Sequence, residues 1–165
     1  MSKNIRLILE NPVLAFAILF VILMVLVVLW TIIRKASVKK RIRKMALGAA
    51  EMTPEEFFAM RNASMGRKHI STEEDFVGVY VLFNKSKQKY YVGQAKKVLS
   101  RINAHLTGHG NGDVYADYKY GDQFTIKAIA LQNSGYRSLD ELEKDTIAAY
   151  NAYNKGYNRT RGNRG

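Results

Sequence analysis

Glu143 is the acidic residue whose position along the chain most strongly suggests chemistry. In a helix that turns by about 100° per residue, it falls within an apolar stripe instead of among the charged residues of the other faces. The stripe is made of Leu139, Leu142, Thr146, Ile147, Tyr150 and Tyr153. A carboxylate on the buried side of a helix is costly unless a cation meets it. The position therefore fits a functional carboxylate, a partner of a structural arginine, or a side chain that reaches water at the edge of the stripe.

Two tripeptides that each hold a tyrosine and a glycine lie about ten residues apart near the middle of the chain. They are Gly78-Val79-Tyr80 and Tyr91-Val92-Gly93, and Arg101, Glu143 and Gly156-Tyr157-Asn158 follow them. In this order the five elements resemble the signature of the GIY-YIG endonuclease domain, over residues 76–158. Valine replaces isoleucine in both tripeptides, a change that keeps β-branching and burial.

This resemblance implies hydrolysis of a phosphodiester by in-line attack of water, assisted by one divalent cation. Glu143 would hold the ion, and its hard carboxylate oxygen suits Mg²⁺ or Mn²⁺. Arg101 would stabilise the additional negative charge of the pentavalent transition state. Tyr80 is the first candidate for the base that accepts a proton from the water, and Tyr91 is the second. A free phenol has a pKa of about 10, so nearby cations must favour its deprotonation; both tyrosines also fit simple packing within a sheet.

His105 and Asn158 complete the candidate catalytic residues. His105 lies four residues after Arg101 on the same helical face, where it could orient water, contact a phosphate or have a structural role. Asn158 matches the terminal asparagine of the family, which implies hydrogen bonds that hold the site together, and a turn residue after Gly156 is the alternative. The glycine-rich stretch 108–113 lacks the Lys-Ser/Thr of a phosphate-binding loop and is expected to be a mobile loop beside the substrate groove.

A β-hairpin must position the two tyrosines. Alternating β-branched and aromatic residues predict strands over 77–83 and 89–92, joined by a turn at 84–87. Side chains alternate along each strand, so Tyr80 and Tyr91 can lie on one surface of the sheet.

Helices and a third strand must position the other candidates. Helical periodicity over 97–106 carries Arg101 and His105, and residues 124–131 predict a strand. Ser138-Leu-Asp-Glu141 predicts a capping box that opens a helix to about Tyr153. The expected fold class is α/β, of the α+β kind: a small antiparallel three-stranded sheet flanked by helices and preceded by a single transmembrane helix.

An apolar stretch near the N-terminus predicts that transmembrane helix. Residues 12–33 contain no charged side chain, and at about 1.5 Å per residue they can cross a hydrocarbon core of roughly 30 Å. The stretch is longer than the apolar part of a secretory signal, which favours an uncleaved anchor over a cleaved signal peptide. Trp30 near its end fits an aromatic anchor at the interface.

The charges that flank the span predict its orientation. The N-terminal side offers Lys3 and Arg6 against Glu10, whereas residues 34–44 carry seven basic side chains. The positive-inside rule therefore predicts a single-pass protein of the cell membrane whose C-terminal domain is cytoplasmic. Of the net charge of +12, residues 1–47 supply +8, so the 34–44 cluster is expected to contact anionic lipids. The basic tail at the C-terminus, residues 159–165, either contacts phosphates of a nucleic acid or is an ordinary solvated terminus.

A second helix is predicted between the membrane and the sheet. It would begin with Thr53 as the N-cap, Pro54 at the first helical position and Glu56 closing a capping box. This helix could pack on the domain or lie on the membrane. The chain divides into an N-terminal flank 1–11, a transmembrane helix 12–33, a basic juxtamembrane segment 34–52, a helical linker 53–75, the nuclease-like domain 76–158 and a basic tail 159–165.

Three classes of function fit these features. The first is a membrane-anchored, metal-dependent endonuclease acting on DNA, with RNA as an alternative substrate. The second is a catalytically silent tether for nucleic acid, and the third is a membrane protein whose domain contacts protein partners that the sequence does not identify. The chain has no cysteine, which excludes a disulfide scaffold and a thiolate metal site.

Overall fold

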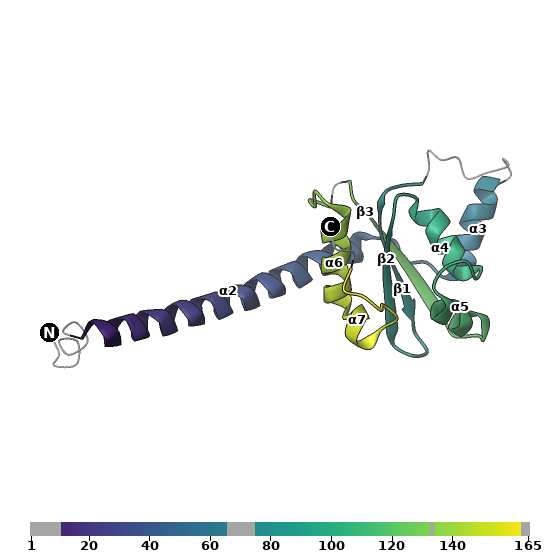
Figure 1. Cartoon of the computed structure of the whole chain (residues 1–165). Helices are drawn as coiled ribbons and strands as arrows, with labels where there is room; N and C mark the ends of the chain where they lie inside the picture. The colour runs from purple at the N-terminus through teal and green to yellow at the C-terminus, as the bar shows by residue number, and fades with distance from the viewer. Residues whose placement is uncertain (1–10, 66–74, 133, 163–165) are drawn as a thin grey trace. The chain divides into compact units, whose positions relative to one another are not determined.

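The computed structural model describes residues 11–65, 75–132 and 134–162 (Figure 1). The described residues fall into two compact units, which are divided between Val38 and Lys39. Helix α2, Pro12–Gly48, has residues in both units. It begins where Asn11 accepts a hydrogen bond from the Leu14 amide (3.2 Å) through its side chain and Pro12 occupies the first helical position.

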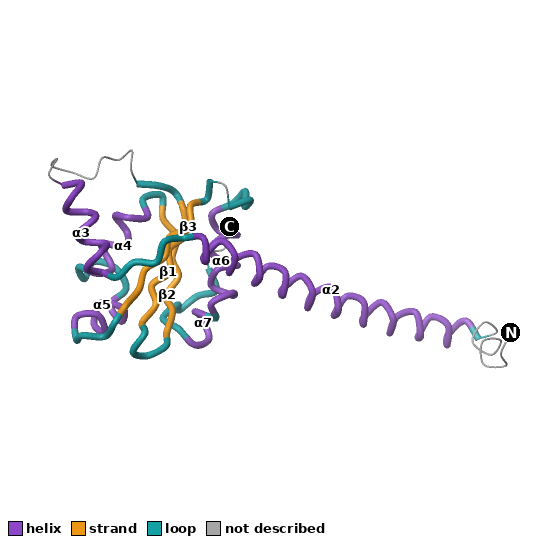
Figure 2. Tube along the Cα trace, turned by 180° about the vertical axis from the view of Figure 1, so that it is seen from behind, coloured by secondary structure: helices purple, strands orange, loops and turns teal. Residues whose placement is uncertain are grey.

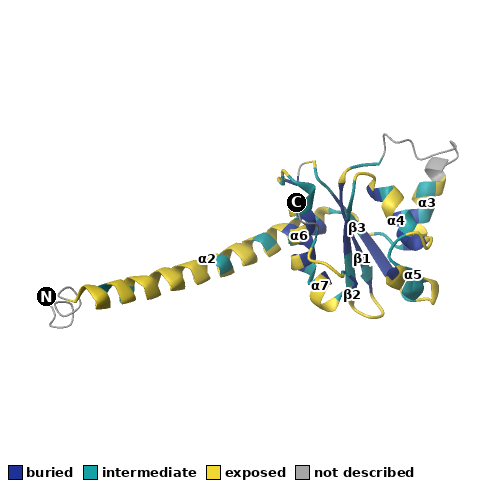
Figure 3. Ribbon diagram, viewed as in Figure 1, coloured by how far each residue is buried: buried dark blue, intermediate teal, exposed yellow. Residues whose placement is uncertain are grey.

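Within the first unit, the apolar side chains of α2 are exposed (Figure 3). Residues Pro12–Ala46 include an 18-residue window with a mean hydropathy of 3.3, and none of that window is buried. By length and composition, this helix can cross a membrane.

The second unit is built on an antiparallel sheet with strand order β2-β1-β3 (Figure 1). The strands are β1, Gly78–Asn84, β2, Lys89–Ala95, and β3, Phe124–Ala130. The predicted hairpin and third strand are confirmed. Tyr80 pairs with Gly93 and Tyr91 pairs with Leu82, so the two tyrosines lie on the same face, as the alternation predicted.

Helices cover both faces of the sheet (Figure 2). One face packs against α3, Pro54–Met65, α4, Val98–Leu106, and α5, Gly112–Lys119, and the other packs against α6, Leu139–Tyr150, and α7, Ala152–Lys155. The core on the first face consists of Phe57, Tyr80, Leu82, Val98, Ile102, Leu106, Val114, Phe124, Ile126 and Tyr157. The predicted three-stranded α+β fold is therefore confirmed.

The helix that precedes the sheet packs on the domain. Its capping box is formed: the Thr53 amide donates to Glu56 Oε2 (2.8 Å), and the Glu56 amide donates to Thr53 Oγ1 (3.2 Å). Phe57 is fully buried in the core, which settles where this helix lies. Just before it, Met52 exchanges backbone hydrogen bonds with Ile126 and so covers part of the outer edge of β3.

Residues of α2 that belong to the second unit also pack on it. Ile42 and Ala46 are buried, and the Arg41 guanidinium lies 4.5 Å from the centre of the Tyr136 ring and donates to the Ser134 carbonyl (3.3 Å). Arg41, one of the seven basic residues expected at the membrane, therefore has partners inside the protein.

Two local predictions are wrong, and one helix was not predicted. The helix predicted to reach Tyr153 is broken, because Asn151 adopts a left-handed backbone conformation (φ 54°) that asparagine tolerates better than most residues. Ser138 sits at the N-cap of α6, but its side chain makes no capping hydrogen bond, so that capping box does not form. Helix α5 was not predicted, although Asn111 caps it through the amides of Asp113 and Val114.

Candidate active site

The two signature tripeptides meet where Tyr80 on β1 lies opposite Gly93 on β2. A Cβ atom at Gly93 would overlap the hydroxyl and the ring of Tyr80. The Tyr80 ring therefore occupies the space that a side chain at position 93 would need. The tyrosine of the first tripeptide and the glycine of the second therefore form one structural unit.

His105 on α4 is the hydrogen-bond partner of Tyr80. Its Nε2 lies 2.8 Å from the Tyr80 hydroxyl, and its Nδ1 accepts a hydrogen bond from the Asn111 amide (2.8 Å). Because Nδ1 acts as an acceptor, the proton of the neutral ring is on Nε2, which donates to the Tyr80 oxygen. Burial, with a smaller contribution from Arg101, lowers the pKa of His105 to about 4, so the ring is neutral at pH 7.

The loop before α5 holds His105 in place. A Cβ atom at Gly110 would collide with the His105 ring, so this glycine allows the loop to close over the imidazole. The stretch 108–113, expected to be a loop beside the groove, thus packs on His105 and then caps α5 through Asn111.

Tyr80, Tyr91 and His105 form an aromatic cluster. The ring centres are 6.2 Å apart for the two tyrosines, 5.5 Å for Tyr80 and His105, and 4.8 Å for Tyr91 and His105. Burial raises the pKa of Tyr80 well above its usual value and Tyr91 adds to the rise, whereas Arg101 opposes it. Burial also raises the pKa of Tyr91, with Tyr80 and Arg101 opposing and the charge of Glu143 adding to the rise.

These electrostatic effects identify which predicted site residues lie together. The charge of Arg101 lowers the pKa of Tyr80, Tyr91 and His105, and the charge of Glu143 raises the pKa of Tyr91. Residues from β1, β2, α4 and α6 therefore surround one place in the fold.

Arg101 is exposed on α4, and this helix has an unusual cap. The Asp75 carboxylate accepts hydrogen bonds from the amides of Leu99 (2.7 Å) and Ser100 (3.0 Å) and from the Ser100 hydroxyl (2.8 Å). The Phe76 carbonyl accepts from the Val98 amide (3.1 Å). The residues that lead into β1 therefore satisfy the free amides at the start of α4 and fix it relative to Tyr80.

Glu143 lies on the buried side of α6, as the periodicity predicted, with 8% of its surface exposed. The described residues contain no group of three histidine, cysteine or acidic side chains that could hold a metal. A single carboxylate fits Mg²⁺ or Mn²⁺, which commonly bind through one or two carboxylates together with water and substrate phosphate. It does not fit zinc, which takes at least three protein ligands.

Asn158 holds the free edge of β2. Its Oδ1 accepts from the Val92 amide (2.9 Å), and its Nδ2 donates to the Val92 carbonyl (2.7 Å). The Tyr157 amide also donates to the Tyr90 carbonyl (2.9 Å). Asn158 thus supplies both hydrogen bonds that a neighbouring strand would make, at the residue between Tyr91 and Gly93.

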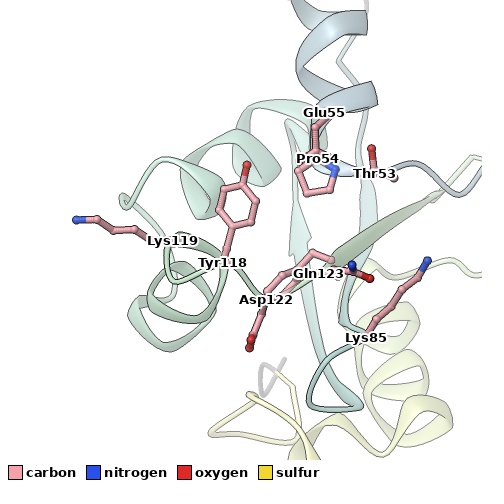
Figure 4. A pocket seen from close by; sticks show the side chains of 10 residues that line it. Thr53, Pro54, Glu55, Lys85, Tyr118, Lys119, Asp122 and Gln123 are labelled. Atoms are coloured by element: carbon pink, nitrogen blue, oxygen red, sulfur yellow. The ribbon is translucent and has the colours of Figure 1, made fainter.

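A separate hollow of about 640 Å³ lies at the other end of the sheet (Figure 4). It is lined by side chains of both charges, among them Glu55, Lys85, Lys119 and Asp122. Lys85 follows the last residue of β1, and four residues of strand separate Tyr80 from that end, a distance of about 13 Å. The hollow is therefore distinct from the aromatic cluster.

The family model of the GIY-YIG catalytic domain matches residues 76–158, half of the chain, and the protein belongs to the GIY-YIG family. No curated protein and no solved structure matched the chain. Domains of this family generally hydrolyse phosphodiester bonds of DNA, and its nucleases typically use divalent metal ions. Membership therefore indicates nuclease activity and a nucleic-acid substrate.

Proposed function

We propose that this protein is a membrane-anchored, divalent-metal-dependent endonuclease that hydrolyses phosphodiester bonds of DNA at the cytoplasmic face of the cell membrane. The observation that carries the proposal is the convergence of Tyr80, Tyr91, Arg101, His105 and Glu143 inside a domain of the GIY-YIG family.

Tyr80 is the proposed proton acceptor for the attacking water, and it can act only as a phenolate, after its own proton has passed to solvent. Its oxygen accepts a hydrogen bond from the Nε2–H of His105, so a phenolate formed there has a donor in place. His105 cannot take the proton onward while its Nδ1 is bound by the Asn111 amide. We therefore assign His105 as a positioning residue that acts through Tyr80, which agrees with its complete burial.

Arg101 is proposed to bind the phosphate and to favour the phenolate. The exposed guanidinium is permanently charged and can donate two parallel hydrogen bonds to phosphate oxygens. The same charge already acts to lower the pKa of Tyr80, against the larger effect of burial. One side chain can thus stabilise both the transition-state charge and the deprotonated base.

Glu143 is the proposed ligand of the divalent cation. When bound, the cation would supply positive charge at the reacting phosphate and the leaving oxygen. The carboxylate that would hold it is nearly buried and lies close enough for its charge to raise the pKa of Tyr91.

The membrane location is proposed from α2 and its flanking charges. The exposed apolar residues from Pro12 onward fit a lipid environment, and the basic residues that follow favour a cytoplasmic C-terminal domain in contact with anionic lipids. A nuclease held there would meet DNA that lies near or crosses the membrane.

A catalytically silent, membrane-tethered module that binds nucleic acid or protein is the second candidate. The observation that favours it is the raised pKa of Tyr80, because burial makes the phenolate that would accept the proton harder to form than in a free tyrosine. The two candidates differ in whether substrate and cation overcome this effect.

Plasmid cleavage by the full chain in nonionic detergent separates them. We expect the wild type to nick or linearise supercoiled DNA with Mg²⁺ or Mn²⁺ and to lose this activity in EDTA. Glu143→Gln should abolish cleavage but retain DNA binding, whereas Glu141→Gln, an exposed acid on the same helix, should cleave normally. Binding without cleavage under every divalent cation would establish the silent module instead.

A further inference from the structure

We propose that residues 159–162 form one wall of the substrate groove and that Arg159 and Arg161 bind phosphates of the nucleic-acid backbone beside the scissile bond. This inference rests on the proposed function and names the residues that hold its substrate. The chemistry that the wall recognises is a chain of phosphodiesters, since its side chains supply guanidinium groups.

The segment has a fixed start and a fixed end. It begins after Asn158, which is bound to Val92 at the edge of β2. It reaches Gly162, where an added Cβ atom would lie 3.3 Å from Lys144 Cα and 3.5 Å from Glu143 Oε2. Gly162 also has a φ of +110°, which other residues rarely adopt, so glycine permits this close approach to α6.

The segment also contacts the opposite side of the site. Arg159 Nη2 lies 3.1 Å from Asp113 Oδ2 at the start of α5. Asp113 comes two residues after Asn111, whose amide holds His105. Residues 159–162 therefore link the start of α5, through the Arg159 side chain, to the Glu143 carboxylate on α6.

The charges on this wall are available to a ligand. The side chains of Arg159 and Asp113 are 82% and 57% exposed, and an ion pair in such a position contributes only about 0–1 kcal/mol. A phosphate that offers two oxygens to the guanidinium can compete with this pair. The Arg161 guanidinium lies 5.1 Å from the centre of the Tyr153 ring, and because Arg161 is exposed, its N–H groups are accessible to an anion.

The first test measures how DNA binding depends on salt. The full chain in nonionic detergent binds a short fluorescein-labelled duplex in EDTA, so that no cleavage occurs, over a series of KCl concentrations. Each protein–phosphate contact contributes roughly 0.9 to the slope of log K against log[salt]. We expect Arg159→Gln and Arg161→Gln each to reduce the slope by about this amount and the double variant by about twice as much.

A matched double variant controls for net charge. Lys85→Gln with Lys119→Gln removes the same charge from the hollow at the other end of the sheet, and it should leave the slope unchanged. Circular dichroism of each variant checks that the fold is retained.

The second test uses the acidic partner of Arg159. Asp113→Asn should release the guanidinium and tighten DNA binding several-fold, and this gain should disappear when Arg159→Gln is also present. If Asp113→Asn tightened DNA binding only by removing a negative charge, the gain would be the same with and without Arg159→Gln. That result would contradict the proposal that Arg159 exchanges Asp113 for a phosphate.

The outcomes separate this inference from the proposed function. Cleavage by the wild type with unchanged slopes in both arginine variants would overturn the wall and leave the nuclease intact. The expected slopes without any cleavage would keep the wall and overturn the nuclease, and no salt-sensitive binding at all would overturn both. Tighter binding or faster cleavage by the double arginine variant would instead make residues 159–162 an inhibitory strap.

Discussion

The ring of Tyr80 lies across the backbone of Gly93, its direct partner on the neighbouring strand. Gly93→Ala would place a methyl group on the tyrosine ring, and such overpacking costs about 1–3 kcal/mol. We expect this loss of stability to appear as a lower unfolding temperature of the full chain, measured by circular dichroism. We also expect a loss of cleavage, because Tyr80 must move. Gly112→Ala, at the start of α5 with open space around it, is the control and should stabilise the protein by about 0.5–1 kcal/mol. Equal unfolding temperatures for both variants would contradict the close approach.

His105 gives the fold a specific dependence on pH. Its pKa is about 4 in the folded protein against 6.5 when unperturbed, so the unfolded chain binds more protons between these values. Its contribution to stability is present above pH 6.5 and is lost as the pH falls towards 4, by up to about 3 kcal/mol.

Chemical denaturation at several pH values measures this effect. His105→Gln keeps an N–H donor for Tyr80 without a titrating ring, so it should flatten the stability profile between pH 6.5 and 4. His109→Gln, at an exposed position, should retain the profile. A wild-type profile that is already flat in this range would show that His105 is not buried in its neutral form.

Asp75 fixes the helix that carries Arg101, through three hydrogen bonds to Leu99 and Ser100. Asp75→Ala should lower the stability by about 0.5–2 kcal/mol, as for other lost caps. It should also reduce kcat more than KM if Arg101 acts mainly on the transition state, and Asp75→Asn, which keeps one acceptor, should recover part of the rate. A loss of stability with unchanged kcat would limit Asp75 to a structural role.

The charge difference across α2 predicts its topology. A reporter fused after Gly165 should be active in the cytoplasm, because seven basic residues follow the apolar span at 34–44. Replacing Arg34, Lys35, Lys39 and Lys40 by glutamine while adding lysines before Asn11 should increase the inverted fraction. Activity of the wild-type fusion outside the membrane would contradict the proposed cytoplasmic location of the GIY-YIG domain.

Period and spacing were enough to predict the hairpin, the shared face of Tyr80 and Tyr91, and the inward direction of Glu143, because each depends on geometry within a single element or a short turn. Two supports of the site could not be predicted in this way. Asp75 caps a helix that starts 23 residues later, and Asn111 holds His105 only after the chain turns back at Gly110. Such contacts depend on tertiary packing, which local sequence patterns do not encode.

Asn151 shows the same limit within a helix. The apolar stripe continues past it to Tyr153, so periodicity predicts a longer helix than α6. The left-handed conformation of Asn151 redirects the chain, which allows Tyr157 to enter the core on the other face and Asn158 to reach β2.

The chain itself covers part of both outer edges of the sheet, β3 through Met52 and β2 through Asn158. Proteins confined to a membrane surface meet one another far more often than the same number of molecules in solution, and open strand edges would let them polymerise side by side. For the membrane-anchored protein proposed above, the cover at both edges would oppose such contact between copies. A fragment cut at residue 76 would lose Met52 and Phe57 and expose the edge of β3, so we expect the unit that folds to be longer than the family signature.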